Sequence, residues 1–282
     1  MITAGIHTFP ELSERDLITI RRLVYEKSGI ALHSGKRALV TARLQKRVRA
    51  GGFRSFKEYV RYVQADGSGD ELTALLDAIA TNHTAFFREP QHFAFLRDIV
   101  LPPILVRGEG GMIHGWSAAC ATGEEPYTIA MTLFDRLGVD ASRRVRLLAS
   151  DLSTKALAIA REGVYRPQRI EDVPRETVRK YFERDPASPR GPLRVAARIR
   201  QVIEFRQLNL LDATQPGRTF DFIFCRNVMI YFDREVQQRV VEALERHLAP
   251  GGYLFISHSE SLNSVTHGLT WIAPAIYRRG PR

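Results

Sequence analysis

The stretch that decides the fold is Trp116-Ser117-Ala118-Ala119-Cys120-Ala121-Thr122-Gly123-Glu124-Glu125-Pro126-Tyr127. It follows an apolar run at residues 112–116 and opens a helical pattern at residues 124–137. A strand, a turn of small residues and a helix, in this order, form the place where nucleotide-type ligands bind to Rossmann-like sheets. Small side chains let the ligand approach the backbone closely. The stretch therefore predicts an α/β fold with a ligand site at the end of this strand.

The same alternation continues toward the C-terminus. Apolar strand-like runs at residues 146–150, 220–225 and 253–257 alternate with helical patterns at residues 154–161 and 234–248. This order predicts a parallel sheet covered by helices on both faces, with ligand bound at the carboxyl ends of the strands. Residues 165–208 break the alternation, and we interpret them as a small inserted β-subdomain. Within it, residues 185–192 have the composition of a loop.

The first 107 residues have only helical patterns. Ser13, Ser34 and Ser55 stand at expected helix starts, and Gly29 and the pair at residues 51–52 stand at expected helix ends. A further helix is expected from residue 90 to about residue 106, since proline is acceptable at a first helical position. We therefore expect two domains: an all-α basic domain at residues 1–89 and an α/β domain at residues 90–282.

Composition narrows the class of protein. The chain has 282 residues, of which 44% are hydrophobic, enough for an ordinary folded core. No apolar run is long enough for a membrane span, and the first residues lack a signal-peptide pattern, so we expect a cytoplasmic protein with no membrane insertion. Cys120 and Cys225 are too few for a disulfide framework, and the eight histidines show no metal-ligand spacing. No metal site is predicted.

The net charge of +10 is concentrated near the N-terminus, because residues 1–65 hold 13 Lys or Arg against 5 Asp or Glu. Lys36, Arg43, Lys46 and Arg47 fall on one side of a helical wheel and form a basic ridge. No aromatic residues interleave with them, as a single-strand nucleic-acid platform would need, so nucleic acid is not expected. The ridge is either a solvated helix face or a docking surface for an acidic partner.

The turn lacks the G-x-G-x-x-G pattern of dinucleotide sites. Glu124 and Glu125 at the helix start would repel a pyrophosphate but suit a cationic ligand such as a sulfonium with an amino-acid tail, or they simply complement the helix dipole. Asp151 ends the next strand, where a carboxylate can accept both ribose hydroxyls. Alternatively, Asp151 or Ser153 caps the following helix.

Residues 226–232 follow the strand at residues 220–225. Asn227 is expected near the ligand, and the Tyr231 hydroxyl could point at a transferred methyl group, although a run of this kind is most often core packing. This segment is not the Asn/Asp-Pro-Pro-Tyr signature of amino methyltransferases.

Six blocks of sequence, in this order along nearly the whole chain, resemble the chemotaxis receptor glutamate methyltransferases. They are residues 81–88, 117–127, 151, 209–210, 226–233 and 248–261. Cys120 departs mildly from the family, which more often has Ser or Thr there. The resemblance implies a Rossmann-like fold that binds S-adenosyl-L-methionine (AdoMet). It implies cofactor contacts at Asn82, Thr84, Arg88, Glu124, Asp151, Asn209, Leu210, Asn227 and Val228.

The resemblance also implies a reaction. Members of this family methylate receptor glutamates, giving γ-glutamyl methyl esters and S-adenosyl-L-homocysteine. A glutamate with a pKa near 4.3 is already ionised at pH 7, so no catalytic base is needed and positioning supplies most of the acceleration. Arg88 and Tyr231 are the expected catalytic residues. Arg88 either grips the AdoMet carboxylate or orients the acceptor glutamate.

The implied partners are the cytoplasmic helices of a chemoreceptor, which the basic ridge would meet. In some relatives the inserted subdomain also binds a pentapeptide at the receptor's C-terminus, and residues 189–195 only partly match that loop. We expect a monomer. Two alternatives stay open: an AdoMet methyltransferase for another carboxylate or a hydroxyl substrate, and a non-catalytic AdoMet-sensing module.

Overall fold

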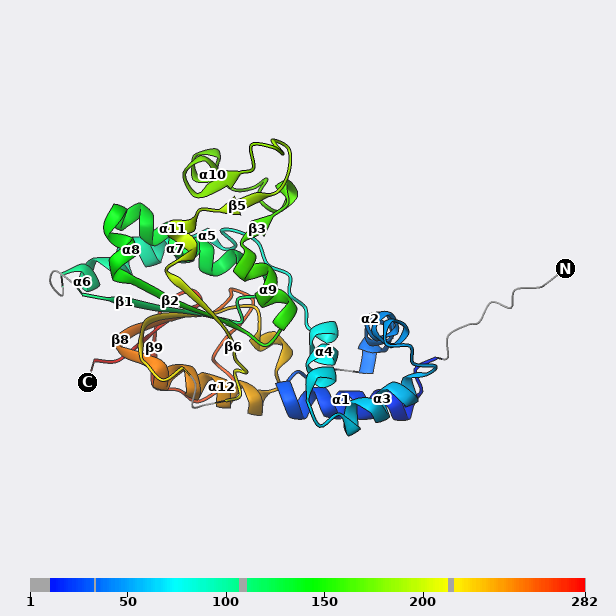
Figure 1. Cartoon of the computed structure of the whole chain (residues 1–282). Helices are drawn as coiled ribbons and strands as arrows, with labels where there is room; N and C mark the ends of the chain where they lie inside the picture. The colour runs from blue at the N-terminus through cyan, green and yellow to red at the C-terminus, as the bar shows by residue number, and fades with distance from the viewer. Residues whose placement is uncertain (1–10, 33, 107–110, 213–215, 282) are drawn as a thin grey trace. The chain divides into compact units, whose positions relative to one another are not determined.

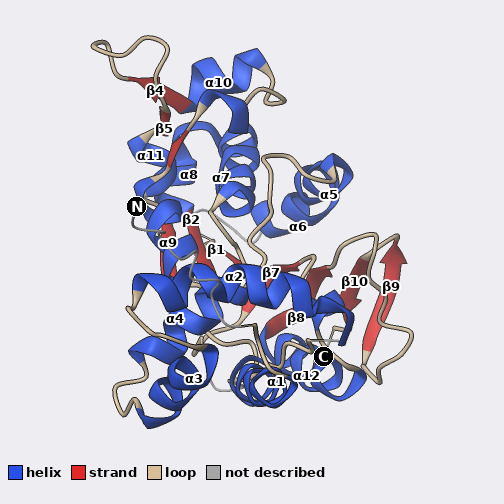
Figure 2. Cartoon of the chain, turned by 90° about the vertical axis from the view of Figure 1, so that its right-hand side faces the viewer, coloured by secondary structure: helices blue, strands red, loops and turns tan. Residues whose placement is uncertain are grey.

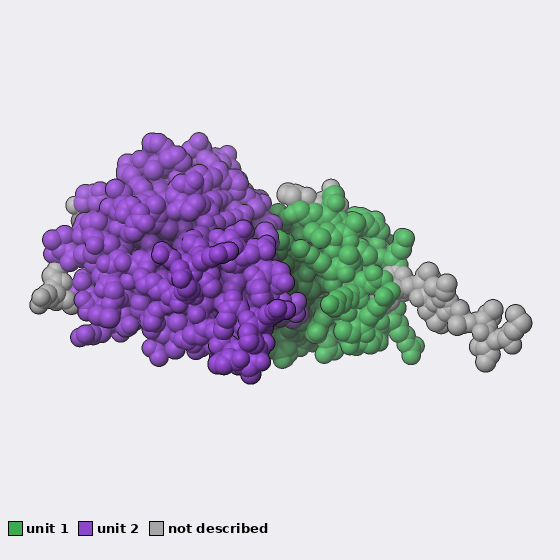
Figure 3. Space-filling model, turned by 90° about the horizontal axis from the view of Figure 1, so that it is seen from above, with its two compact units in different colours: residues 1–81 green, residues 82–282 purple. Residues whose placement is uncertain are grey.

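The computed structural model describes residues 11–32, 34–106, 111–212 and 216–281. Its contacts divide the chain into two compact units, Met1–Thr81 and Asn82–Arg282, which Figure 3 shows in two colours. This division lies before the expected boundary at residue 89. Residues 82–88, which belong to the first of the six resembling blocks, and Glu89 therefore count with the second unit. Among the described residues, no helix is long and apolar enough to span a membrane.

The first unit is helical, as predicted. Its helices are α1 (Glu14–Ser28), η1 (Ser34–Lys36), α2 (Arg37–Ala50), α3 (Phe56–Ala65) and α4 (Asp70–Ile79). The Ser13 and Ser55 side chains accept backbone N–H groups at the starts of α1 and α3, which confirms two predicted caps. The third start differs, because Ser34 opens a single 3-10 turn and α2 begins after Lys36 without a side-chain cap. Gly29 ends α1 at φ 72°, a conformation that favours glycine.

The second unit is built on a sheet of seven strands in the order β6-β2-β1-β7-β8-β10-β9. The strands are β1 (Ile113–Ala118), β2 (Val145–Asp151), β6 (Ile203–Gln207), β7 (Phe220–Cys225), β8 (Leu248–Phe255), β9 (Leu269–Ala273) and β10 (Ile276–Arg279). The first five in spatial order are parallel, which confirms the predicted sheet. The antiparallel β9–β10 hairpin adds an edge that the alternation did not predict.

Helices cover both faces of this sheet. Figure 1 shows α5 (Pro90–Phe95) and α7 (Glu124–Leu137) on one face and α12 (Arg234–His247) on the other. The helix expected at residues 90–106 is present as α5, a π turn η2 (Leu96–Val100) and α6 (Leu101–Leu105). The shorter elements are η3 (Gly138–Asp140), α8 (Ala141–Arg144), α9 (Thr154–Glu162) and η5 (Met229–Tyr231). Aromatic rings fill the core under α5, where Phe224 and Phe255 stack with centroids 4.2 Å apart.

The inserted subdomain is present and has its own small sheet, in the order β3-β5-β4. It comprises β3 (Val164–Tyr165), η4 (Pro167–Arg169), α10 (Arg175–Tyr181), β4 (Phe182–Arg184), β5 (Leu193–Val195) and α11 (Ala197–Arg200). The strands are antiparallel, unlike the five parallel strands of the main sheet. Residues 185–192 form turns between β4 and β5, as their composition predicted. Figure 2 shows this subdomain projecting beyond α7.

Candidate active site

The candidate site lies where three neighbouring strands end. Ala118, the last residue of β1, is level with Ser150 of β2 on one side and Cys225 of β7 on the other. The turn after β1, Asp151 and Asn227 therefore meet at one edge of the sheet. The chain order changes direction at β1, between β2 and β7, and ligands of doubly wound folds bind in the crevice at such a point.

Backbone strain concentrates at this edge. Among the described non-glycine residues, positive φ angles occur at Phe87, Glu89, Ala119, Ala121 and Asn227, and otherwise only at Ala275. L-residues adopt this conformation at a cost of order 1–3 kcal/mol each, and such residues cluster at ligand and active sites. The strain supports a functional role for the turn and for the run at residues 81–88.

Asp151 stabilises the turn after β1, and the N-cap of α9 is a different residue. Its buried carboxylate accepts the N–H groups of Ala121 and Ser153, each at 2.8 Å. The cap of α9 is Ser153, whose hydroxyl accepts the N–H of Ala156. The same hydroxyl accepts a 3.2 Å hydrogen bond from the Asn82 amide, so Asn82 lies beside the end of β2.

The remaining predicted contacts near β2 follow the neighbouring strand. The backbone N–H of Leu208 donates to the Asp151 carbonyl at 3.1 Å, which places the end of β6 beside the end of β2. Asn209 and Leu210 come next and are half-buried. The Asn209 side chain accepts the N–H of Leu211. Thr84 is half-buried in the run that contains Asn82.

Glu124 differs from its expected role as an open charge. Its side chain is fully buried, and it accepts hydrogen bonds from the Thr122 hydroxyl at 2.6 Å and from the Arg169 guanidinium of η4. Arg169 also donates to the Thr122 hydroxyl at 2.9 Å. The carboxylate thus already has a cation from the inserted subdomain. The sequence did not indicate Arg169, because only the fold brings η4 to the start of α7.

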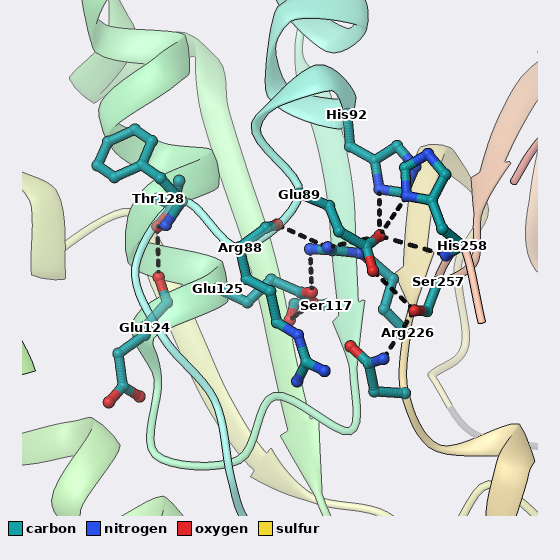
Figure 4. A network of polar contacts seen from close by, with 12 residues as sticks. Arg88, Glu89, His92, Ser117, Glu124, Glu125, Thr128, Arg226, Ser257 and His258 are labelled. Carbon is teal, nitrogen blue, oxygen red and sulfur yellow. Dashed lines mark hydrogen bonds and ion pairs between the residues drawn. The ribbon is translucent and has the colours of Figure 1, made fainter. Parts of the chain in front are cut away.

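Arg226 is the centre of a buried network that joins the predicted blocks (Figure 4). Its guanidinium lies 2.9 Å from a Glu89 carboxylate oxygen and 3.1 Å from one of Glu125, and it donates to the Arg88 carbonyl at 2.6 Å. The Ser117 hydroxyl of β1 donates to Glu125 at 2.7 Å. These contacts fix the end of the run at residues 81–88 against β1, α7 and β7.

Burial and hydrogen bonds shift the two carboxylates of this network in opposite directions. Burial raises the pKa of Glu125, and Arg226 only partly offsets it. Burial also opposes ionisation of Glu89, but hydrogen bonds from Ser257 and Arg226 outweigh it and lower the pKa of Glu89 to about 2. Glu89 is therefore the permanently ionised partner of Arg226. The sequence did not indicate Glu89 or Ser257, and it indicated Glu125 only as a charge at the start of a helix, not as a partner of Arg226.

Asn227 is held from two sides. Its amide donates to the Ser257 hydroxyl at 2.7 Å, and that hydroxyl donates in turn to Glu89 at 2.7 Å. The Glu260 carboxylate accepts the backbone N–H groups of Asn227, Met229 and Ser257 at 2.8–3.0 Å. One carboxylate therefore fixes the loop that carries Asn227.

The loop after β7 is only partly core. Met229 and Phe232 are buried, whereas Val228 and Tyr231 are half-buried and Ile230 is 51% exposed. The packing interpretation of this run therefore holds for Met229 and Phe232. Tyr231 ends the 3-10 turn η5, in the same loop as Asn227 and four residues further along the chain.

Arg88 has no such fixed partner. Its guanidinium makes a long hydrogen bond of 3.4 Å to the His83 carbonyl, and no described carboxylate lies within ion-pair distance of it. In Figure 4 its charged end lies apart from the network around Arg226. A half-buried arginine beside a strained edge, with no carboxylate of its own, is suited to bind the carboxylate of a ligand.

Cys120 follows β1 and Cys225 ends β7, so both lie beside this edge, and both are buried, with exposed fractions of 1% for Cys120 and 0% for Cys225. Burial raises the pKa of both thiols, so the reactive thiolate is scarce.

We therefore expect a disulfide reagent such as DTNB to modify the thiols of the folded protein at least about 100-fold more slowly than those of the urea-unfolded chain. A fast phase in the folded protein would contradict this burial. AdoMet should slow the reaction further by stabilising the folded state.

The predicted basic ridge lies in the first unit, where internal contacts use part of its charge. The Arg43 guanidinium donates to the carbonyls of Ile79 and Ala80 and to the Thr81 hydroxyl. Arg47 forms a two-pronged ion pair with Glu71 of α4. Lys36 precedes α2, and Lys46 is exposed. Of the four, Lys46 presents its charge most openly to solvent.

Comparison with known proteins gives matches over both units. Residues 82–275 match the family model described as "CheR methyltransferase, SAM binding domain", and residues 15–80 match "CheR methyltransferase, all-alpha domain". A chemotaxis protein methyltransferase of Borreliella burgdorferi is 36% identical over 95% of this chain and 95% of its own length. The one from Escherichia coli is 38% identical over 94% of this chain and 91% of its own length.

These matches agree with the geometry. The AdoMet-binding family model covers all three strand ends that form the candidate site, together with the run at residues 81–88 from Asn82 onward. The all-alpha family model covers the helices of the first unit. Both matches and the near full-length relatives show that the chain belongs to the CheR family of AdoMet-dependent chemotaxis protein methyltransferases.

Proposed function

We propose that this protein transfers the methyl group of AdoMet to glutamate side chains of a chemoreceptor, giving γ-glutamyl methyl esters and S-adenosyl-L-homocysteine. The observation that carries the proposal is Arg88, a cation without a described carboxylate partner at the edge where three strands end. Both AdoMet and the acceptor glutamate bring a carboxylate to such a site. Membership of the family supports AdoMet as the methyl donor.

The cofactor set inferred from the sequence fits this edge. Asp151 is proposed to bind the ribose and Asn227 the amino-acid end, while the alanines of the turn leave room for the ligand at the backbone. Glu124 is proposed to position Thr122 and Arg169 at the ligand rather than to contact it directly, because both groups already donate hydrogen bonds to its carboxylate. The full set remains Asn82, Thr84, Arg88, Glu124, Asp151, Asn209, Leu210, Asn227 and Val228.

The proposed chemistry needs orientation rather than proton transfer. AdoMet supplies an electrophilic methyl group on a sulfonium. The acceptor glutamate is ionised at pH 7, so its oxygen forms the new bond as the sulfur–carbon bond breaks, and no proton moves. Tyr231 is proposed to hold the acceptor carboxylate in line, and Arg88 is proposed either to join it there or to grip the carboxylate of AdoMet. The network around Arg226 and Glu260 fixes the backbone on both sides of them.

Methyl transfer from labelled AdoMet tests the proposal against its alternatives. Label that is released from receptor glutamates by mild base supports an ester. Base-stable label would indicate an amine product, and label on a small molecule would indicate another substrate. AdoMet binding without any transfer would support a sensing module.

Receptor docking is proposed to use the basic ridge, with Lys46 as its most exposed charge. We expect Lys46→Glu to raise the KM for receptor methylation about 2- to 5-fold at low salt, with little change in kcat. Charges at the rim of an interface mainly change the rate at which the two proteins associate. The difference should shrink at high ionic strength, since the Debye length falls to about 3 Å at 1 M salt.

A matched control is Lys57→Glu, which makes the same charge change at an exposed position of α3. It should leave the KM near that of the wild type. Equal effects of both variants would indicate a general charge effect and would remove the ridge from docking. Insensitivity of the wild-type KM to salt would have the same consequence.

The inserted subdomain offers a second proposed docking site, for the receptor's C-terminal pentapeptide. A pocket there is lined by apolar and basic side chains. The apolar ones include Ile170, Val173, Phe182 and Leu193, and the basic ones are Arg175, Arg179 and Arg184. Apolar peptide side chains suit the floor, and a terminal carboxylate suits the exposed arginines.

We expect Arg179→Glu to weaken binding of such a peptide about tenfold in a calorimetric titration, because it reverses a charge in the pocket lining. Arg166→Glu, at an exposed position outside that lining, is the control. Absence of peptide binding by the wild type would leave the ridge as the proposed docking surface.

We also propose that the protein acts in the cytoplasm as a monomer, which light scattering on a sizing column would test.

A further inference from the structure

A cluster of three side chains, Glu89, His92 and His258, shares Glu89 with the Arg226 network, and the proposed reaction gives its two histidines no role. Each side chain offers one ligand atom, and these atoms all lie within 4.8 Å of one another. The cluster joins the start of α5 to the segment after β8, as Figure 4 shows. Spacing in the sequence could not indicate it, because His258 is far along the chain from the other two.

Two separations within the cluster are close to those between ligands around one small metal ion. A Glu89 carboxylate oxygen (Oε2) lies 3.4 Å from Nδ1 of His92 and 3.0 Å from Nδ1 of His258. Two ligands that each bind the same Zn²⁺ at about 2.0–2.1 Å are about 3.2–3.5 Å apart in a tetrahedral site. The two imidazole rings are stacked nearly parallel, with centroids 4.8 Å apart. Because an imidazole nitrogen binds a metal ion in the plane of its ring, one of these stacked rings must turn before both can bind the same ion, and the exposed His258 side chain is free to do so.

His92 supplies an independent sign of a missing ligand. The residue is fully buried, yet neither ring nitrogen has a partner in hydrogen-bond geometry among the described residues. Buried polar groups without partners are uncommon and call for an explanation such as an ion. His258 is 41% exposed, which gives an ion access from solvent.

Arg226 limits which ions can bind. Its guanidinium contacts the same Glu89 oxygen, so a metal ion must compete with it. Arg226 would keep Glu125 and the Arg88 carbonyl as partners if it released Glu89. Two imidazoles and one carboxylate favour zinc-class ions over Mg²⁺ or Ca²⁺, which prefer all-oxygen sites.

We propose that Glu89, His92 and His258 form a site for one divalent transition metal ion of the zinc class, and that its occupancy slows methyl transfer. Glu89 also accepts the hydrogen bond of Ser257, which in turn holds the Asn227 amide. An ion that draws Glu89 toward the histidines loosens this support for Asn227. The inhibition, though not the binding, rests on the proposed function.

The test uses the full-length, tag-free protein with Co²⁺ and Zn²⁺ as probes. Co²⁺ should give visible absorption bands that saturate at one equivalent, and Zn²⁺ should abolish them. His258→Ala changes a half-exposed side chain, and Glu89→Gln keeps the size of its side chain. Each should weaken binding at least tenfold. His267→Ala, outside the cluster, should bind like the wild type.

Binding and turnover are read separately. The proposed site would be overturned if Co²⁺ gave no absorption that saturates at one equivalent in the wild type. It would also be overturned if His258→Ala bound Co²⁺ with unchanged affinity. If the site is real, Zn²⁺ should inhibit wild-type methyl transfer at the concentrations that displace Co²⁺. Equal inhibition of His258→Ala, relative to its own metal-free rate, would overturn the link to turnover. A protein that binds Co²⁺ but transfers no methyl group without metal would count against the proposed function, not against the site.

Discussion

Replacing Arg226 with leucine is expected to lower the free energy of unfolding of the second unit by about 3–5 kcal/mol, the usual cost of leaving a buried carboxylate without its partner. The Arg226 side chain is 2% exposed, and its partners Glu89 and Glu125 are 19% and 12% exposed. Water can reach neither carboxylate well enough to replace the guanidinium. The Arg88 carbonyl loses a hydrogen bond as well.

Urea unfolding followed by tryptophan fluorescence measures this effect. Trp116 and Trp271, the only tryptophans of the chain, both belong to the second unit, so the signal reports that unit. Arg143→Leu is the matched control, because its side chain is 83% exposed, and a change within about 0.5 kcal/mol is expected there. Adding Glu125→Gln to Arg226→Leu should recover part of the loss. A loss below about 1 kcal/mol in Arg226→Leu would mean that the network is not the strong contact its burial indicates.

Features that depend on neighbouring residues could be predicted from the sequence. The caps at Ser13 and Ser55 need only a hydroxyl and an N–H group three residues later, so a short pattern defines them. The parallel strands and the turn after β1 follow from the period of the apolar residues and from small side chains. These local rules fixed the α/β fold and the edge where the site lies.

Pairing between charges distant in sequence could not be predicted. Glu124 looked like an open charge at a helix start, but its cation, Arg169, comes from the inserted subdomain. Arg47 does lie on the basic ridge of α2, yet it pairs with Glu71, because α4 packs against that helix. A pattern gives the face on which a charge lies. The residue that pairs with this charge depends on tertiary packing, which cannot be predicted from the spacing of residues in the sequence.

Replacing Arg88 with alanine is expected to lower kcat/KM for methyl transfer at least about tenfold, since a charge-assisted bidentate contact with a carboxylate is lost. The folded state should be little affected. The side chain is half-buried, its hydrogen bond to His83 is long, and its contact with Arg226 uses only the backbone carbonyl. Arg143→Ala serves as the control, and near-normal turnover in Arg88→Ala would remove Arg88 from the mechanism.

The kinetic pattern of the Arg88 variants identifies the carboxylate that the arginine binds. If the guanidinium grips AdoMet, the Kd for AdoMet rises and saturating AdoMet restores much of the rate. If it orients the acceptor glutamate, the Kd for AdoMet stays constant while kcat falls, because the lost contact matters mainly as the new bond forms. Arg88→Lys keeps the positive charge but loses the planar guanidinium, which can make two parallel hydrogen bonds. It should therefore restore less of the lost rate if Arg88 orients the acceptor glutamate than if it grips AdoMet.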